Sequence, residues 1–220
     1  VVIRGSTNML AGGSVLDRQI SGGGSVGIRL SSVEGVLLKD LTVKRAQTGL
    51  LMDSASRLCW IDSVKSVDNS SAGFSVQSST DIILRNCLAA NNGSCGLITA
   101  GNVPSASLLW ENGVIWKSGT AASLGAGSSS EIRNSFLQGS GSGARSLYMG
   151  IGSSLVTDFN NYSVTNDAVM FEQARVSGGS LVYGNLASWM WASGQDVHSL
   201  SHNPMFDDPD HLDFHIQSAA

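Results

Sequence analysis

A short pattern recurs along the chain at a nearly constant interval. An apolar residue stands two positions before an Asp or Asn eight times, and successive anchors lie 22 to 27 residues apart, with a mean of 24. The anchors are Asp17, Asp40, Asp62, Asn86, Asn112, Asn134, Asn161 and Asn185. Self-similarity at such an interval is typical of repeat proteins. The fold must therefore set equivalent residues of successive units side by side.

The residues around each anchor predict β-strands. The residue directly before the anchor is mostly polar, whereas the residue two positions before it is always apolar. Because neighbouring residues of a strand face opposite sides, we expect the apolar column to point into the core. Its members are Val15, Leu38, Trp60, Leu84, Trp110, Ile132, Phe159 and Tyr183. Each repeat holds two or three such short strands, and no stretch has a convincing helical period.

A helix-free unit of this length buries its apolar face only by stacking on its neighbours. The repeat is too short for a propeller blade and lacks the leucine pattern of leucine-rich repeats. It resembles the right-handed parallel β-helix (pectate-lyase-like) superfamily, in which Asn stacks as a ladder at one turn. The resemblance implies an all-β solenoid, and the anchors predict about eight to nine turns in a single domain over residues 1–220. Residues 203–220 break the repeat and resemble the closing segment of secreted β-helix proteins, so we expect them to cap the rod.

Composition narrows the range of partners and of locations. Charged residues make up 14% of the chain and the net charge is −4, so no basic field attracts nucleic acid. No apolar run is long enough to span a membrane. The three cysteines, Cys59, Cys87 and Cys95, cannot all pair within the chain, and we expect buried free thiols. The resemblance to secreted proteins implies an extracellular or cell-surface location in a bacterium.

The sequence offers little evidence of catalysis. The Gly-His-Gly and Arg-x-Lys motifs of β-helix hydrolases are absent. Arg85, Glu111 and Arg133 directly precede successive anchors, so they are either basic groups for a lyase or a surface charge ladder. We expect no metal or other cofactor, and calcium bound by C-terminal carboxylates is the alternative. Those carboxylates are Asp207, Asp208, Asp210 and Asp213.

Outward-facing aromatic residues favour a binding function. The column four residues after the anchors is mostly polar, yet it contains Trp116 and Trp189. Trp191 shares a face with Trp189 if this segment is a strand, and Tyr148 faces outward on an earlier strand of its repeat. Sugar rings stack their apolar faces on aromatic side chains while polar neighbours fix the orientation. We therefore predict carbohydrate binding by these four residues.

A short β-helix without the hydrolase motifs also looks like a xylan-binding family of carbohydrate-binding modules that adopts this fold in gut-bacterial enzymes. That resemblance implies a non-catalytic module, appended to a glycoside hydrolase, that binds a plant cell-wall polysaccharide, with xylan-type chains preferred. A covalently linked catalytic domain is then the expected partner, with no membrane and no nucleic acid. Two alternatives stay open. One is a lyase or hydrolase acting on pectin or another uronate polymer, and the other is a purely structural β-helix segment.

Overall fold

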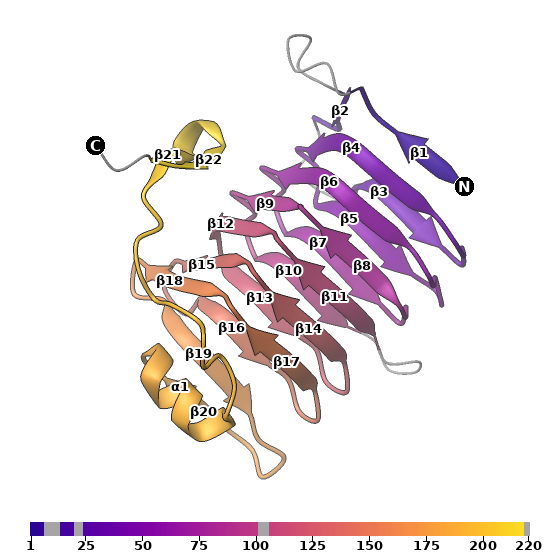
Figure 1. Cartoon of the computed structure of the whole chain (residues 1–220). Coiled ribbons are helices and arrows are strands. Elements are labelled where there is room, and N and C mark those ends of the chain that lie inside the picture. The colour runs from indigo at the N-terminus through magenta and orange to yellow at the C-terminus, as the bar shows by residue number, and fades with distance from the viewer. Residues whose placement is uncertain (7–13, 20–23, 101–105, 218–220) are drawn as a thin grey trace.

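The computed structural model describes residues 1–6, 14–19, 24–100 and 106–217. Its strands stack along one axis from the N-terminus to the C-terminal region (Figure 1). They form a 12-stranded sheet, called sheet A here, and an 8-stranded sheet, called sheet B. All pairings in these two sheets are parallel except that of the last strand of sheet B.

Sheet B contributes one strand to each coil. Its strands are β3 (Val26–Ser31), β5 (Thr48–Asp53), β7 (Ala72–Gln77), β10 (Cys95–Ala100), β13 (Thr120–Leu124), β16 (Arg145–Met149), β19 (Val169–Ala174) and β20 (Ser180–Tyr183).

Sheet A opens as one broad face and then divides into two limbs. It begins with β1 (Val2–Arg4), β2 (Ser14–Asp17), β4 (Leu37–Lys44) and β6 (Trp60–Val67). The first limb continues through β8 (Ile82–Arg85), β11 (Ser107–Glu111), β14 (Ser129–Arg133) and β17 (Ser154–Asp158). The second limb continues through β9 (Leu88–Ala90), β12 (Val114–Ser118), β15 (Phe136–Ser140) and β18 (Asn161–Thr165).

A single left-handed residue bends the chain between the two limbs in each coil. Asn and Asp tolerate this conformation better than most residues, which explains why the repeat carries them here. The corner residues, with φ between 51° and 58°, are Asp40, Ser63, Asn86, Asn112, Asn134 and Phe159. Four of the eight anchors of the sequence repeat are thus corner residues.

In the described part of the chain, six complete coils pass through both sheets, from β3 to β18. This confirms the solenoid, but with fewer turns than the eight to nine expected. After β19 the chain reverses, because β20 pairs antiparallel with it. Asn185 is then the N-cap of helix α1 (Leu186–Ser193), and Asp208 ends strand β21 (Phe206–Asp208) of a hairpin. The anchor Asn185, and Asp208 at 23 residues beyond it, match the repeat interval but are not coil corners.

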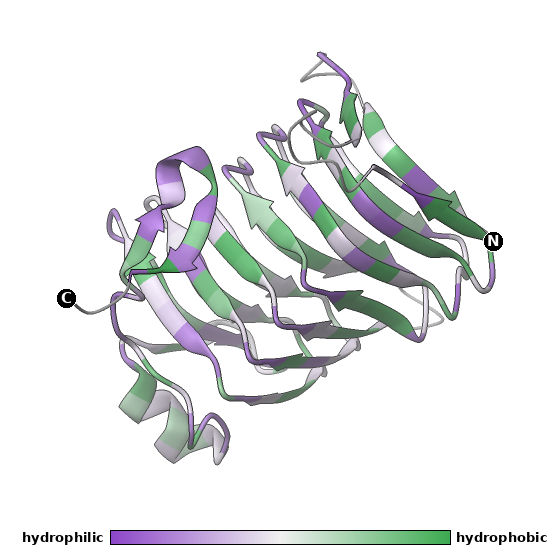
Figure 2. Ribbon diagram, turned by 45° about the horizontal axis from the view of Figure 1, so that its top comes forward, coloured by the Kyte–Doolittle hydropathy of each residue, from purple (hydrophilic) through white to green (hydrophobic). Residues whose placement is uncertain are grey.

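The inward column forms the core between the sheets. Leu38, Leu84, Trp110 and Ile132 are fully buried, as predicted. The indole of Trp110 also accounts for the neighbouring glycine, because a Cβ on Gly113 would lie 2.5 Å from the ring. Along each strand hydrophobic residues alternate with hydrophilic ones in many places, as a strand with one buried face requires (Figure 2).

Three members of the predicted inward column are on the surface instead, and the first of them, Val15, is 45% exposed on β2. Trp60 is 55% exposed and Phe159 is 57% exposed. The register pairs the inward residue Leu38 with Ile61, and the inward residue Ile132 with Thr157. Ile61 and Thr157 therefore occupy the inward positions in place of Trp60 and Phe159. In both coils the anchor misses the true corner: Asp62 lies one residue before the corner Ser63, and Asn161 lies two residues after the corner Phe159. Since strand facing has a period of two, a slip of one residue turns Trp60 outward.

The buried amide ladder lies at a different corner from the anchors. Asn69 and Asn92 follow the second limb and are each 1% exposed. The Asn69 amide Nδ2 donates to Asn92 Oδ1 at 2.9 Å, and Asn69 Oδ1 accepts from the backbone of Ala46 at 3.1 Å. The stacked amides thus join successive coils by hydrogen bonds inside the rod.

The C-terminal segments cover the rod in two places. Helix α1 packs against β19 and β20 at the last coil. The hairpin of β21 and β22 (Asp213–Ile216), joined by the 3₁₀ turn Pro209–His211, contacts the second limb along its side (Figure 1). The segment expected to cap the end of the rod therefore covers a flank, and its residues 218–220 lie outside the described part of the chain.

Cys59, Cys87 and Cys95 are all free, and the first two are buried. Within the described residues, no helix has the length and apolar character needed to cross a bilayer.

Candidate functional site

A largely apolar row, interrupted by Glu131, runs along the outward face of the first limb of sheet A, parallel to the rod axis. Hydrogen-bonded register places equivalent residues of successive coils next to one another. Trp60 and Val156 are 55% and 63% exposed, and the residues between them are partly exposed. Contiguous exposed apolar surface often marks an interaction site. The row, called the Trp60 row here, comprises Leu37, Trp60, Ile83, Leu109, Glu131 and Val156.

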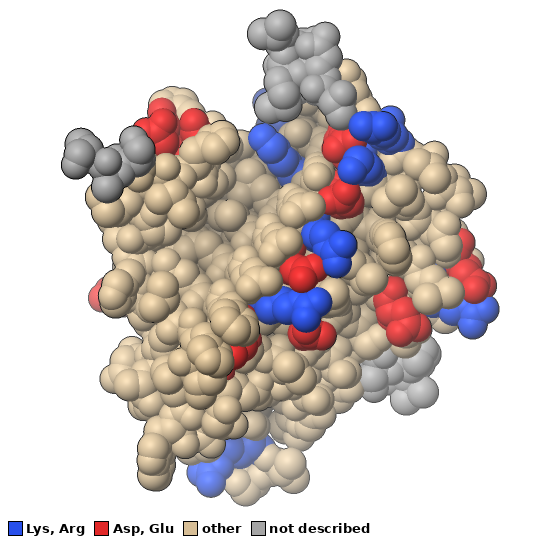
Figure 3. Space-filling view, viewed as in Figure 1, with Lys and Arg blue, Asp and Glu red and all other residues tan. Residues whose placement is uncertain are grey.

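A charged row runs beside the Trp60 row, two residues further along each strand. Basic and acidic side chains alternate along it in a diagonal band (Figure 3). Its members are Lys39, Asp62, Arg85, Glu111, Arg133 and Asp158. The predicted column of Arg85, Glu111 and Arg133 therefore lies on one face at one-coil intervals, as expected.

The charged groups of this row pair with one another. Glu111 accepts from Arg85 at 2.7 Å and from Arg133 at 2.9 Å, and Lys39 Nζ lies 2.8 Å from Asp62. Burial raises the pKa of Asp62, but the hydrogen bonds from Lys39 and Asn86 outweigh that effect and leave the pKa below its ordinary value. The row thus consists of compensated charges held in fixed positions.

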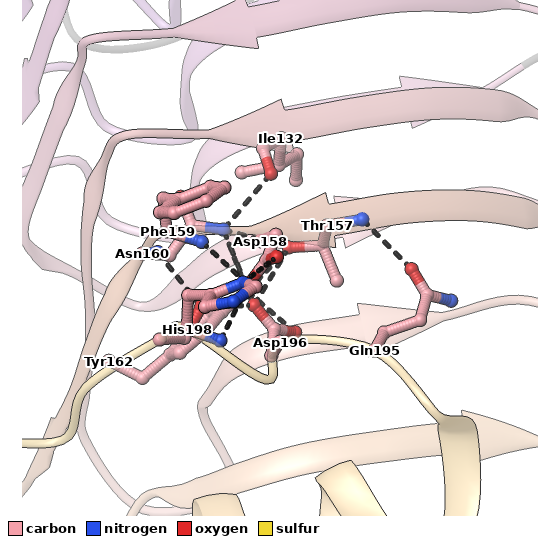
Figure 4. A network of polar contacts seen from close by, with 10 residues as sticks. Ile132, Thr157, Asp158, Phe159, Asn160, Tyr162, Gln195, Asp196 and His198 are labelled. Carbon is pink, nitrogen blue, oxygen red and sulfur yellow. Dashed lines mark hydrogen bonds and ion pairs between the residues drawn. The ribbon is translucent and has the colours of Figure 1, made fainter.

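An aromatic platform ends the face at the last coil. The rings of Phe159 and His198 stack with centroids 4.7 Å apart and planes within 5° of parallel. His198 is held by Asp158, which lies 2.7 Å from Nδ1 and also accepts from the His198 backbone at 2.9 Å (Figure 4). Val156 lies next to this platform. Trp60 is four strands away from Val156, a distance of about 19 Å along the axis at the usual strand spacing.

Shallow hollows lie along the face between these groups. One of about 540 Å³ is lined by Trp60, Ile83, Leu109 and Val156 together with polar residues of the preceding turns. A smaller one of about 220 Å³ adjoins it between Leu37 and the charged row. The face therefore offers an extended, uneven surface with apolar and polar sides, and no deep pocket is found on it among the described residues.

The four aromatic residues predicted to bind carbohydrate do not share a surface. Trp189 is only 2% exposed, because its segment is the helix α1 and its ring stacks on Phe171 at 5.1 Å. Trp116 faces outward but lies beneath the hairpin, with its ring centroid 5.9 Å from those of Phe206 and Phe214. The prediction that these two tryptophans are exposed is wrong.

The other two aromatic residues are accessible, in separate places. Trp191 is 91% exposed on α1, and Tyr148 is half-buried on sheet B, with Arg145 Cζ 5.9 Å from its ring centre. Their proposed contacts with a polysaccharide remain predictions.

The repeat pattern does not predict the Trp60 row, although the sequence carries a signal for it. Strands with one solvated face alternate apolar and polar residues. The runs Val-Leu-Leu at 36–38, Ile-Ile-Leu at 82–84 and Leu-Leu-Trp at 108–110 instead place consecutive apolar residues on both faces. Such runs indicate strands with an apolar outward face.

No group of three or more His, Cys, Asp or Glu side chains converges on a metal-binding geometry within the described residues. Three of the C-terminal carboxylates have separate basic partners. Asp208 contacts His211 at 2.8 Å, and Asp210 contacts Lys117 at 2.6 Å. Asp213 contacts His215 in the same way.

Comparisons with known proteins agree with this architecture. Residues 2–105 match the family described as "Right handed beta helix region". The crystal structure of pectate lyase Pel9A superposes with a TM-score of 0.53 at 14% sequence identity, over 96% of this chain and 70% of that one. No curated protein sequence matches the chain. The protein is a right-handed parallel β-helix, and at this level of identity the structural likeness concerns the fold.

Proposed function

We propose that the face formed by the Trp60 row and the charged row binds a neutral plant cell-wall polysaccharide, with xylan-type chains preferred. The observation that carries the proposal is that an apolar row and a hydrogen-bonding row run side by side along the rod axis. Sugar rings present apolar C–H faces and polar hydroxyl edges, so a chain lying along the axis meets both rows at once. The rows extend over five or more strands, which suits a polymer better than a single sugar.

The charge balance favours a neutral polymer over a polyanion. The basic side chains of the face are already paired, since Arg85 and Arg133 both bind Glu111 and Arg133 also contacts Glu131. A uronate polymer would have to displace these carboxylates to reach the guanidinium groups, at a cost in Coulomb energy. Hydroxyl groups can instead bond to the unused lone pairs and N–H groups of the row without breaking it.

The wider setting belongs to the same proposal. The domain would be a non-catalytic module, linked covalently to a glycoside hydrolase and located outside a bacterial cell. A β-helix fold shared with a pectate lyase supports a link to polysaccharides. The module would hold its substrate without cleaving it.

A uronate lyase is the second candidate, and one observation favours it. Asp158 fixes His198 through Nδ1, which leaves Nε2 oriented as a base, and Arg133 neighbours Asp158 in the register. A base beside an arginine is what proton abstraction next to a carboxylate requires. Incubation with polygalacturonate would then release unsaturated products that absorb in the ultraviolet, and the proposed binding module releases none.

Affinity electrophoresis tests the binding proposal. Gels containing xylan should retard the protein, and gels containing polygalacturonate should retard it less. Trp60→Ala should abolish most of the retardation because it removes the largest apolar surface of the face, while circular dichroism should stay unchanged since the side chain is half-exposed. Equal mobility in all gels for the parent protein would refute the proposal.

A further inference from the structure

A second cavity lies on the neighbouring limb of sheet A, across the corner from the Trp60 row. It sits on the outward side of the second limb, over β12, β15 and β18, and it is roofed by residues 201–204, which lead from the last coil to the hairpin (Figure 1). Its volume is about 420 Å³, within the range of sites that enclose a small ligand. Nothing in the polysaccharide proposal uses this cavity.

The lining of this cavity is polar but uncharged. One part of the wall is apolar, with the indole of Trp116, Val164 and Met170. The remainder carries hydroxyl, amide and imidazole groups, from Gln138, Ser163, Thr165, His202 and Asn203 among others. Among the described residues, no Asp, Glu, Lys or Arg lines the cavity, and the nearby ammonium of Lys117, 5.7 Å from the centre of the Trp116 ring, is paired with Asp210. A charged ligand would therefore find no free counter-ion in the lining.

Gln138 has hydrogen-bonding capacity to spare at this site. Its residue is only 5% exposed, yet its side chain makes two long bonds, from the Lys117 backbone to Oε1 at 3.4 Å and from Nε2 to Ser163 Oγ at 3.5 Å. Both distances lie at or beyond the usual range for hydrogen bonds. A buried amide normally forms shorter bonds, and the hydroxyl groups of a ligand would supply them.

The roof of the cavity is fixed by backbone pairing, so the cavity exists before a ligand enters. Leu200 bridges to Asn161, its carbonyl accepts from Tyr162 N at 2.9 Å, and His202 N donates to Asn161 Oδ1 at 3.0 Å. The buried Asp196 network holds Tyr162 from the inner side (Figure 4). A preformed cavity saves the ordering cost that a flexible one incurs on binding.

From these features we infer that the cavity beneath residues 201–204 binds one or two rings of a neutral saccharide, independently of the polymer-binding face. The indole of Trp116 supplies the apolar contact with a sugar ring, here inside a cavity rather than on the open surface. Gln138 and Ser163 supply donors and acceptors to the hydroxyl groups. The site takes a short sugar or a chain end, because the hairpin closes one side of it with Phe206 and Phe214 packed on Trp116.

The test is a titration of the whole chain with D-xylose, L-arabinose, D-glucose and xylobiose, with D-galacturonate as the charged counterpart. Binding is followed by calorimetry and by the NMR signals of the Gln138 side-chain amide and the Trp116 indole. At least one neutral saccharide should bind and shift both signals, and galacturonate should not. No shift of either signal with any neutral sugar at about 50 mM, well above a millimolar dissociation constant, would overturn the inference.

Three variants locate the binding. Gln138→Leu removes the amide and Ser163→Leu fills the cavity, so each should weaken saccharide binding at least tenfold. Gln77→Leu makes the same exchange at an exposed residue of β7 in sheet B, and it should leave saccharide binding unchanged. Unchanged saccharide binding in both cavity variants would refute the assignment. Trp60→Ala should leave this binding intact while removing retardation by xylan, so failure at one site is distinguished from failure at the other.

Discussion

Replacement of Asp196 by alanine should loosen the C-terminal closure of the rod. Asp196 is fully buried and accepts from Trp189 Nε1 at 2.8 Å and from Ser199 Oγ at 2.6 Å. Tyr162 OH and Thr157 Oγ1 approach the same carboxylate at 3.2 Å and 3.3 Å. This one side chain therefore joins α1, the last coil and the segment that follows α1.

The expected cost follows from the donors left behind. Thr157 and Tyr162 lie 2.8 Å apart and can bond to each other, but Trp189 Nε1 and Ser199 Oγ lose their acceptor in the buried network. Each orphaned buried donor costs about 1–3 kcal/mol, so the loss of two partners in Asp196→Ala should lower the free energy of unfolding by about 2–6 kcal/mol. Asp196→Asn keeps one acceptor oxygen and should cost about 1–3 kcal/mol.

Urea denaturation followed by tryptophan fluorescence measures this loss, with Asp207→Ala, an exposed carboxylate of the hairpin, as the matched control. Because solenoid coils contact only their neighbours, hydrogen exchange should accelerate in α1 and β18 well before the first coils. A loss below about 1 kcal/mol for Asp196→Ala, or exchange that accelerates uniformly along the chain, would refute the assignment of Asp196 as the centre of this closure.

Three further predictions concern the core, the charged row and the thiols. Trp110→Ala should cost about 3–5 kcal/mol in urea denaturation because the indole is fully buried, and a negligible loss would contradict the inward column. Glu111→Gln frees Arg85 and Arg133 from their shared carboxylate, so retardation in polygalacturonate gels should increase; unchanged mobility would show that the pairing does not set the charge preference. Burial raises the pKa of the Cys87 thiol to about 12, so iodoacetamide at pH 8 should label it only after unfolding, and rapid labelling of the native protein would contradict its burial.

The sequence predicts the class of fold because more than one feature recurs at the same interval. The apolar column and the left-handed corner at Asp40, Asn86, Asn112 and Asn134 recur at intervals that only stacked coils explain. The same logic fails where a coil departs from the consensus. Ser63 holds the corner that Asp62 was expected to hold, and one residue of slip reverses every side chain of a strand.

The binding residues were harder to predict because they depend on tertiary packing. Trp116 is on an outward column as expected, but the column alone does not reveal that the hairpin folds back over it. Trp189 matches the repeat interval by coincidence. The sequence around it does carry the capping signals of a short helix. Asn185 caps the helix by accepting from Ser188 N, and Gly194 ends it in the left-handed conformation.

The central claim is that the Trp60 row, rather than another exposed aromatic residue, contacts the polysaccharide. Calorimetric titration with a xylan oligosaccharide should compare the parent protein with Trp60→Ala and with Trp191→Ala, which removes a 91% exposed tryptophan from α1. We predict at least a tenfold loss of affinity for Trp60→Ala and no change for Trp191→Ala. Full affinity in Trp60→Ala, or a loss confined to Trp191→Ala, would contradict this prediction.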